Sequence, residues 1–457
     1  MVYFVFFYFL FVLSTHMIGL FNAHTIAPLV IPYCAILYYF FKYMQADNVI
    51  EFSSEILGAL LIVLTAFEFD NIIANLENYH HFLPVSVNIL ICLCFIVFLI
   101  CIAGLFKFIP FFTKNNLCIA CISILIMHTL FIFFVPNPRI DVYVHLKEAV
   151  EYFLAFKNPY SNIYTQIYPP EQIKLLYYDD PVFLKYVPFQ SAPPVTIALS
   201  AIGALLGDIR MIGAILFCMC PLLMRNICSQ NFPTLSDNTH KMMAFIPLAF
   251  PAQLHLIFLA WTDMSIGFFL ILFIYFFINK KTVASYAALG IFLSLKQYSV
   301  IYLIPFLFIM NIRDWRLYFV TGGIVILPLA FYALWDFNGF IDSIILYELK
   351  QPFREDSISI AVLLLRYLNI KLYSGFPNTM ILLSSMVVSV YCSFKKLSIL
   401  NTEYKQIKFM LYVVLFQFSN FLMFSKQSFL NQYYFLILIF YLTMLFSIQR
   451  EPEPLCT

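Results

Sequence analysis

The segment from Pro136 to Tyr160 holds the residue types best suited to acid–base chemistry at a membrane surface. Asp141 follows a long apolar run that two prolines end, and it opens an amphipathic stretch. At helical spacing, Asp141, His145 and Glu148 stand at i, i+4 and i+7, which places them on one face. A carboxylate fixed there could take a proton from a substrate hydroxyl, or it could cap the N-terminus of the helix. The residues alone leave both interpretations open.

A second face of the same stretch is apolar and ends at Asn158-Pro159-Tyr160. Its side chains predict a helix that lies flat in the membrane interface, and they are Val142, Leu146, Val150, Phe153 and Leu154.

Three basic residues lie close to apolar runs and need a physical explanation: Lys296, Arg354 and Lys426. An ionised side chain near lipid costs about 2.5–3.5 kcal/mol unless it is paired or hydrated, so something must compensate Lys296. Three cations from separate turns could converge on an anionic lipid phosphate. Each one alone could instead extend its ammonium or guanidinium group to the interface.

The composition requires lipid as the solvent for most of the chain. Of its 457 residues, 63% are hydrophobic and 11% are charged, and the mean hydropathy is +0.89. Soluble proteins have roughly 25% charged residues, so a water-soluble fold is excluded. The net charge of +2 gives no reason to expect that the chain binds nucleic acid, or that a polybasic segment binds acidic lipids. The eleven cysteines, scattered through apolar runs, are interpreted as small packing residues.

The apolar runs predict an all-α polytopic membrane helical bundle of about 13–15 spans, with interfacial helices in the outer loops. The N-terminus lacks a basic residue and a cleavage site, so it is interpreted as a retained first span. The predicted spans are 2–21, 25–44, 55–75, 83–109, 117–135, 191–206, 209–224, 242–260, 264–279, 283–295, 299–312, 317–335, 376–394, 407–425 and 432–449.

Polar stretches and loop charges divide the chain into blocks and orient it. We expect an N-terminal four-span block at 1–115, a core at 116–335 that includes an outer loop at 136–190, a second outer loop at 336–375, and C-terminal spans at 376–457. Basic residues cluster at alternate span ends, which are therefore predicted to be cytoplasmic. One conflict remains, because two full spans at 191–206 and 209–224 would put Arg225 on the wrong side. The short run at 191–206, which opens with two prolines, is the better candidate for a re-entrant segment.

Metal signals are weak. His80 and His81 share a loop with several acidic residues, but adjacent histidines on a loop are usually just solvated. The Cys118-Ile-Ala-Cys121 spacing lies inside a predicted span without a nearby histidine or carboxylate. No metal ligand is therefore assigned.

The order of the motifs between 117 and 449 resembles that of the GT-C glycosyltransferases, most of all their polyprenyl-phosphate-mannose-dependent members. A span ends, Asp141 follows, an interfacial helix ends in Asn-Pro-Tyr, and Pro193-Pro194 and then Gly207-Asp208-Ile209-Arg210 come next. Further likenesses are Trp261-Thr262-Asp263, Ser294-Leu295-Lys296-Gln297-Tyr298, Arg354 to Ser359, and Ser425 to Tyr434. The chain departs from the family in the four-span block that precedes Asp141.

The resemblance implies a role for each of these residues. Asp141 would be the catalytic base, and Lys296, Arg354 and Lys426 would bind the donor phosphate. The residues expected to bind the substrate are His145, Glu148, Tyr160, Asp263, Gln297, Asp356, Asn431 and Tyr433.

The implied activity is an integral membrane, inverting hexosyltransferase with its site on the extracytoplasmic or luminal face. It would move a hexose, with mannose as the first choice, from a polyprenyl- or dolichyl-phosphate donor to a hydroxyl of a glycan, glycolipid or protein. No cofactor is required, although Asp263 and Asp356 leave a divalent metal open. No nucleic-acid partner is expected, and the lack of a phosphate-cradling glycine loop among only 12 glycines argues against a nucleotide-sugar site.

Two other functions stay open. A transporter or flippase of lipid-linked sugars would usually show internal repeats and broken spans near the bilayer centre, and no repeat is visible here. An O-antigen-type polymerase or ligase would rely on outer-loop arginines, for which Arg139 and Arg354 are candidates. A purely structural scaffold would not need Lys296 or Asp263 at membrane depth.

Overall fold

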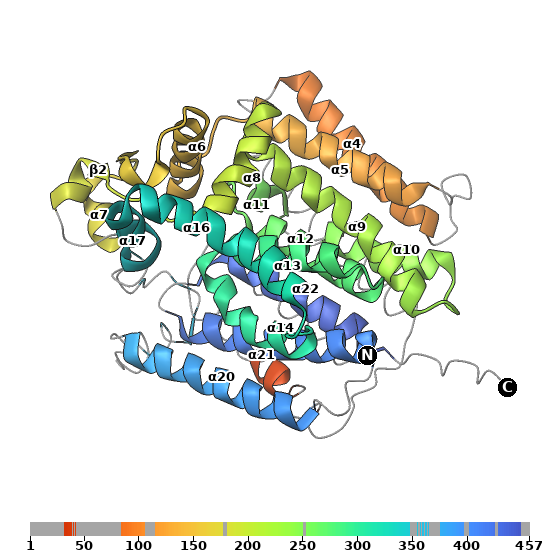
Figure 1. Ribbon diagram of the computed structural model, residues 1–457. Coiled ribbons are helices and arrows are strands. Elements are labelled where there is room, and N and C mark those ends of the chain that lie inside the picture. The colour runs from red at the N-terminus through yellow and green to blue at the C-terminus, as the bar shows by residue number, and fades with distance from the viewer. Residues whose placement is uncertain are drawn as a thin grey trace.

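Apolar helices packed side by side form nearly the whole of the protein in the computed structural model (Figure 1). The structure describes residues 32–38, 40, 42, 84–105, 115–176, 181–249, 253–347, 354, 357, 359, 360, 362, 364, 375–396, 402–425 and 428–448. Within these ranges, five helices are long and apolar enough to cross a membrane. They are α4 (Val85–Leu105), α5 (Asn116–Phe134), α9 (Met211–Asn231), the Trp315–Trp335 helix and α21 (Glu403–Phe424). These helices support the predicted all-α membrane bundle.

The centre of the bundle is α12 (Asp263–Ile278), which packs against α9, α13 (Thr282–Ser294), α21 and α22 (Leu430–Leu445). Leu270, Ile271, Phe273 and Ile274 of α12 are fully buried. By contrast, α4 leaves six large apolar side chains exposed, as expected of a helix that faces lipid. The helix α20 (Gly375–Lys396) packs along α21.

Three predicted spans are not continuous α-helices. The predicted span 242–260 is divided into α10 (Asp237–Phe245), η4 (Ile246–Ala249) and α11 (Gln253–Phe258). Pro247 lies at this break, where its ring removes one backbone donor. The predicted span 299–312 becomes η5 (Gln297–Tyr302) and α14 (Leu303–Ile309). The predicted span 317–335 begins as α15 (Trp315–Leu317), passes through a π-helical turn η6 (Tyr318–Gly322) and continues as α16 (Gly323–Trp335).

The predicted span 191–206 is one of the shorter predicted core spans. It forms α8 (Pro194–Leu205), whose 12 residues rise only about 18 Å, against about 30 Å for a hydrocarbon core. Near its start, the Thr196 hydroxyl donates to the carbonyl of Leu295, at the end of α13. After its end, Gly207 lies against the ring of Phe133 at the C-terminus of α5.

Both ends of α8 lie near the start of α12. Leu295, which bonds to Thr196, precedes Lys296, the partner of Asp263. After the end of α8, Arg210 bonds to the Phe258 carbonyl, five residues before Asp263. We therefore keep the prediction that 191–206 is re-entrant, which would leave Arg225, farther along α9, at the opposite end.

The first outer loop folds into a small subdomain at one end of the bundle (Figure 1). It contains α6 (Asp141–Leu154), η2 (Pro159–Ser161), α7 (Pro170–Leu176), η3 (Pro181–Leu184) and an antiparallel pair, β1 (Tyr164–Thr165) with β2 (Tyr186–Val187). From the second outer loop, α17 (Phe337–Ile341) and η7 (Asp342–Leu346) pack against it. These segments share a hydrophobic core separate from that of the bundle.

The helix α6 corrects the prediction of an interfacial stripe. Leu146 and Val150 are buried within the protein, because α6 packs on α8. Val142 and Leu154 stay exposed. The apolar face of α6 therefore attaches the outer subdomain to the bundle more than it attaches the helix to lipid.

Candidate active site

The carboxylate of Asp263 lies buried at the outer-loop end of the bundle. It lies in the first turn of α12, where the helix dipole favours an anion, and the residue is 1% exposed. Its oxygens accept hydrogen bonds from Lys296 Nζ at 2.9 Å, from Asn431 Nδ2 at 2.7 Å and from the Tyr298 hydroxyl. Three predicted site residues, from three separate elements, therefore meet at one point.

Lys296 occupies the turn between α13 and η5, and its side chain is 22% exposed. Its ion pair with Asp263 compensates the positive charge that the sequence places close to two apolar runs. The ammonium also lies 5.5 Å from the centre of the Tyr298 ring. Next to it, the side-chain amide of Gln297 donates to the carbonyl of Ser191 and so ties this turn to the segment before α8.

The predicted polar face of α6 exists, and it holds the segment from Thr165 to Tyr168. His145 Nε2 lies 3.0 Å from the Thr165 carbonyl, and the Glu148 carboxylate accepts from the Thr165 backbone N–H at 2.9 Å and from its hydroxyl. The backbone N–H of Asp141 donates to the Tyr168 hydroxyl at 3.4 Å. Burial lowers the pKa of His145, while the negative charges of Asp141 and Glu148 act in the opposite direction.

Tyr168 lies next to Asp141 and within electrostatic reach of Arg354. Burial raises the pKa of Tyr168, and so does the negative charge of Asp141, whereas the positive charge of Arg354 opposes the shift. The guanidinium of Arg354 lies 4.9 Å from the centre of the Phe429 ring. Phe429 is two residues before Asn431, which bonds to Asp263.

Five of the predicted site residues gather in this neighbourhood: Asp141, Arg354, Asn431, Asp263 and Lys296. Asp263 bonds to Lys296 and Asn431, and Arg354 lies against Phe429, two residues before Asn431. The charges of Asp141 and Arg354 both act on Tyr168. Ser357 reinforces this neighbourhood, because the backbone N–H of Ser428 donates to the Ser357 hydroxyl at 2.7 Å.

The remaining predicted residues lie elsewhere. Tyr160 is buried, and its hydroxyl donates to the Ala192 carbonyl at 2.7 Å. Tyr433 is fully buried on α22. Lys426 and Asp356 lie outside the described residues, as do His80 and His81.

Two tyrosines of this neighbourhood, Tyr168 and Tyr298, were not among the predicted site residues. A signal for each was present, because Tyr298 directly follows Lys296-Gln297 and Tyr168 precedes a Pro-Pro pair. Tyr298 donates to the Asp263 carboxylate and Tyr168 accepts from the Asp141 backbone N–H, and spacing along the chain reveals neither contact.

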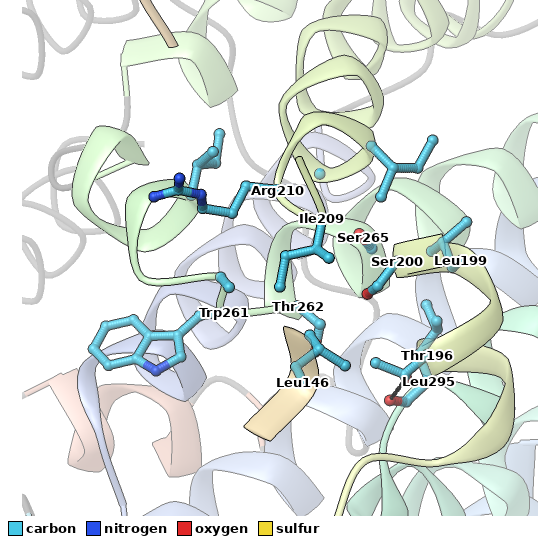
Figure 2. Close-up of a pocket in the computed structure, with 14 residues that line it drawn as sticks. Leu146, Thr196, Leu199, Ser200, Ile209, Arg210, Trp261, Thr262, Ser265 and Leu295 are labelled. Carbon is cyan, nitrogen blue, oxygen red and sulfur yellow. Dashed lines mark hydrogen bonds between the residues drawn. The ribbon is translucent and has the colours of Figure 1, made fainter. Parts of the chain in front are cut away.

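A small cavity lies beside Asp263, between α6, α8 and the start of α12 (Figure 2). Its lining includes Leu146, Ser200, Arg210, Thr262 and Ser265. The cavity measures about 20 Å³, which holds about one water molecule. A hexose therefore does not fit in it, and a sugar would have to bind nearer the outer loops.

Among the residues that the structure describes, no group of three or more His, Cys, Asp or Glu side chains gathers in a way that would hold a metal ion. Comparison with known proteins found no matching protein family, no matching curated protein and no matching solved structure.

Proposed function

We propose that this chain is an integral membrane glycosyltransferase of the GT-C type, which transfers a hexose from a polyprenyl-phosphate donor to an acceptor hydroxyl. The observation that carries the proposal is the gathering of Asp141, Arg354, Asp263 and Lys296 at one end of an apolar bundle, around Tyr168, Phe429 and Asn431. A carboxylate beside cations, at the end of helices long enough to cross a bilayer, suits a substrate with an anionic head and a lipid tail.

In the proposed reaction, Asp141 takes the proton of the acceptor hydroxyl while that oxygen forms a bond to the anomeric carbon. The bond between the anomeric carbon and the phosphate oxygen breaks, and the phosphate leaves with the electron pair. Attack from the face opposite the phosphate inverts the anomeric centre. Arg354 and Lys296, together with Lys426, stabilise the charge on the leaving phosphate. Mannose is the proposed sugar, and the extracytoplasmic or luminal face the proposed side.

The contacts of Asp263 change its role from the one expected. Lys296, Tyr298 and Asn431 already occupy its oxygens, and it is almost completely buried. Its proposed role is therefore to hold Lys296 in place and balance its charge, without contacting the sugar. A donor phosphate reaches Lys296 from the exposed part of that side chain and shares it with Asp263.

The test is transfer by purified protein in lipid nanodiscs with polyprenyl-phosphate mannose and a set of acceptors. Asp141→Asn should reduce the rate at least about 100-fold, since general-base catalysis contributes that much, while donor binding stays as in wild type. Glu171→Gln is a matched control, because Glu171 is an exposed carboxylate on α7 in the same outer subdomain.

An Asp141→Asn variant as active as wild type would remove the base assignment. If wild-type protein forms no product but moves intact donor between leaflets of proteoliposomes, the glycosyltransferase proposal fails and the flippase alternative replaces it.

A further inference from the structure

Arg210 is the most deeply buried cation among the described ion pairs. Its side chain has no exposure to solvent, and that of its partner Asp208 is 13% exposed. The guanidinium lies within hydrogen-bond distance of five acceptor atoms: both Asp208 oxygens at 2.8 Å, the Phe258 carbonyl at 3.2 Å, the Ile132 carbonyl at 3.0 Å and Asn137 Oδ1 at 3.0 Å. Its Nη2 group shares two hydrogens among three of these acceptors. Only an arginine has enough donors, in a planar fork, to make this set.

Two of the acceptors are carbonyls that their own helices leave unbonded. Residue 136, which would normally donate to the Ile132 carbonyl at the end of α5, is a proline and has no N–H. Phe258 is the last residue of α11, so its carbonyl has no intrahelical donor. The positive charge of Arg210 thus lies between two helix C-termini, where the helix dipoles favour a cation.

The turn before α9 fixes this charge in space. Gly207 adopts φ +108°, which favours glycine. The backbone N–H of Arg210 donates to Asp208 Oδ1 at 2.8 Å. The turn itself therefore holds Asp208 and Arg210 together, independently of their contacts with other segments.

Arg210 contacts the chain on both sides of Asp141. Asn137, four residues before Asp141, accepts from Arg210. Tyr143, two residues after Asp141, places its ring 4.7 Å from the guanidinium. Burial, together with the negative charge of Asp208, raises the pKa of Tyr143 to about 12.

We infer that Arg210, together with Asp208, is a positioning residue that sets where the Asp141 carboxylate stands relative to the bundle. Contacts at both Asn137 and Tyr143 leave the start of α6 little freedom to shift or rotate. The claim that this position matters for transfer rests on the proposed function. The claim that Arg210 orders the start of α6 does not rest on it.

The experiment compares Arg210→Lys with Arg225→Lys by hydrogen–deuterium exchange in nanodiscs without substrate. Lysine keeps the charge but cannot bond five acceptors, so we expect amides of residues 137–146 to exchange about tenfold faster in Arg210→Lys. Arg225 pairs with Asp237 on the exposed surface at the far end of α9, so Arg225→Lys should exchange like wild type. If Arg210→Lys does not fold, Asn137→Ala, which removes one acceptor, replaces it with the same expectation.

Wild-type exchange over 137–146, or an increase spread equally over all helices, would overturn the ordering role. In the transfer assay, Arg210→Lys should lower kcat at least about tenfold with the KM for the donor unchanged, because only the base has moved. Faster exchange with an unchanged kcat would overturn the positioning role. A wild-type protein without transfer activity would defeat the proposed function and leave the exchange result standing.

Discussion

Asp263 and Lys296 are a pair in which one member is buried and the other is partly hydrated. The side chains are 1% and 22% exposed, and the charged atoms lie 2.9 Å apart. Removing one member of a buried pair leaves the other charge uncompensated, which typically costs about 3–5 kcal/mol. The cost should be larger when Asp263 is left without its partner than when Lys296 is, because the lysine can extend its ammonium into water.

This asymmetry predicts that Lys296→Met lowers the melting temperature in detergent more than Asp263→Asn does. The double variant Asp263→Asn/Lys296→Met should melt above Lys296→Met, because it leaves no buried charge without a partner. Lys280→Met is the control: Lys280 pairs with Glu403 at 3.5 Å, with both side chains exposed, so no measurable change is expected. Equal melting of Lys296→Met and the double variant would show that the two charges are not coupled.

Helix positions were largely predictable from the sequence, whereas their contacts were not. The helices α4, α5, α12 and α13 lie within a few residues of their predicted ranges, whereas α9 continues to Asn231, past its predicted end at 224. A continuous apolar run almost forces a helix, since every backbone group must be bonded within lipid. The break at 246–249 and the short α8 depend on prolines and on neighbouring helices, which hydropathy does not record.

The candidate site was predictable as a set of residue types but not as an arrangement. Asp263, Lys296 and Asn431 were each recognised, but they are far apart in the sequence, and the hydrogen bonds that join them require the fold. The importance of Arg210 was missed for the same reason, because its acceptors lie on four different segments. The amphipathic pattern of α6 indicated a helix correctly, but its apolar side chains Leu146 and Val150 are buried where α6 packs on α8.

The packing of α17 against η2 gives a prediction at the level of an element. A Cβ added to Gly339 would lie 2.6 Å from both the Tyr160 carbonyl and Asp336 Oδ2. Asp336 also accepts from the Ser161 hydroxyl at 2.6 Å, so the two outer loops meet at this point. Gly339→Ala should therefore separate the loops and speed up limited proteolysis of 155–165.

The matched control is Gly213→Ala on α9, where an added Cβ meets nothing within 4 Å. Alanine in a helix interior is worth about 0.5–1 kcal/mol over glycine, so this variant should be at least as stable as wild type. A Gly339→Ala protein with wild-type proteolysis would show that the contact between the loops is looser than its distances indicate.

At the scale of the whole molecule, the candidate site lies at one end of the bundle, and a group of basic residues in ion pairs lies at the other. The outer subdomain, α17 and the candidate site occupy one end (Figure 1). At the other end, Arg225 and Lys241 both pair with Asp237, and Arg316 pairs with Asp314. If the basic end faces the cytoplasm, the candidate site faces the opposite compartment, where a lipid-phosphate sugar would have to be presented.

This arrangement predicts the side from which single cysteines react, with the native thiols replaced or blocked. In sealed cells, a membrane-impermeant maleimide should label Phe156→Cys, since Phe156 is 90% exposed in the outer subdomain. It should not label Gln230→Cys near the end of α9 until the membrane is opened. The decisive position is Leu205→Cys at the end of α8, which is 76% exposed. Because α8 begins and ends at the same end of the bundle, Leu205→Cys should follow Phe156→Cys. If Leu205→Cys reacts only after the membrane is opened, as expected for Gln230→Cys, then α8 crosses the membrane. Arg210 and Asp141 would then lie at opposite membrane surfaces, and the positioning role would fail.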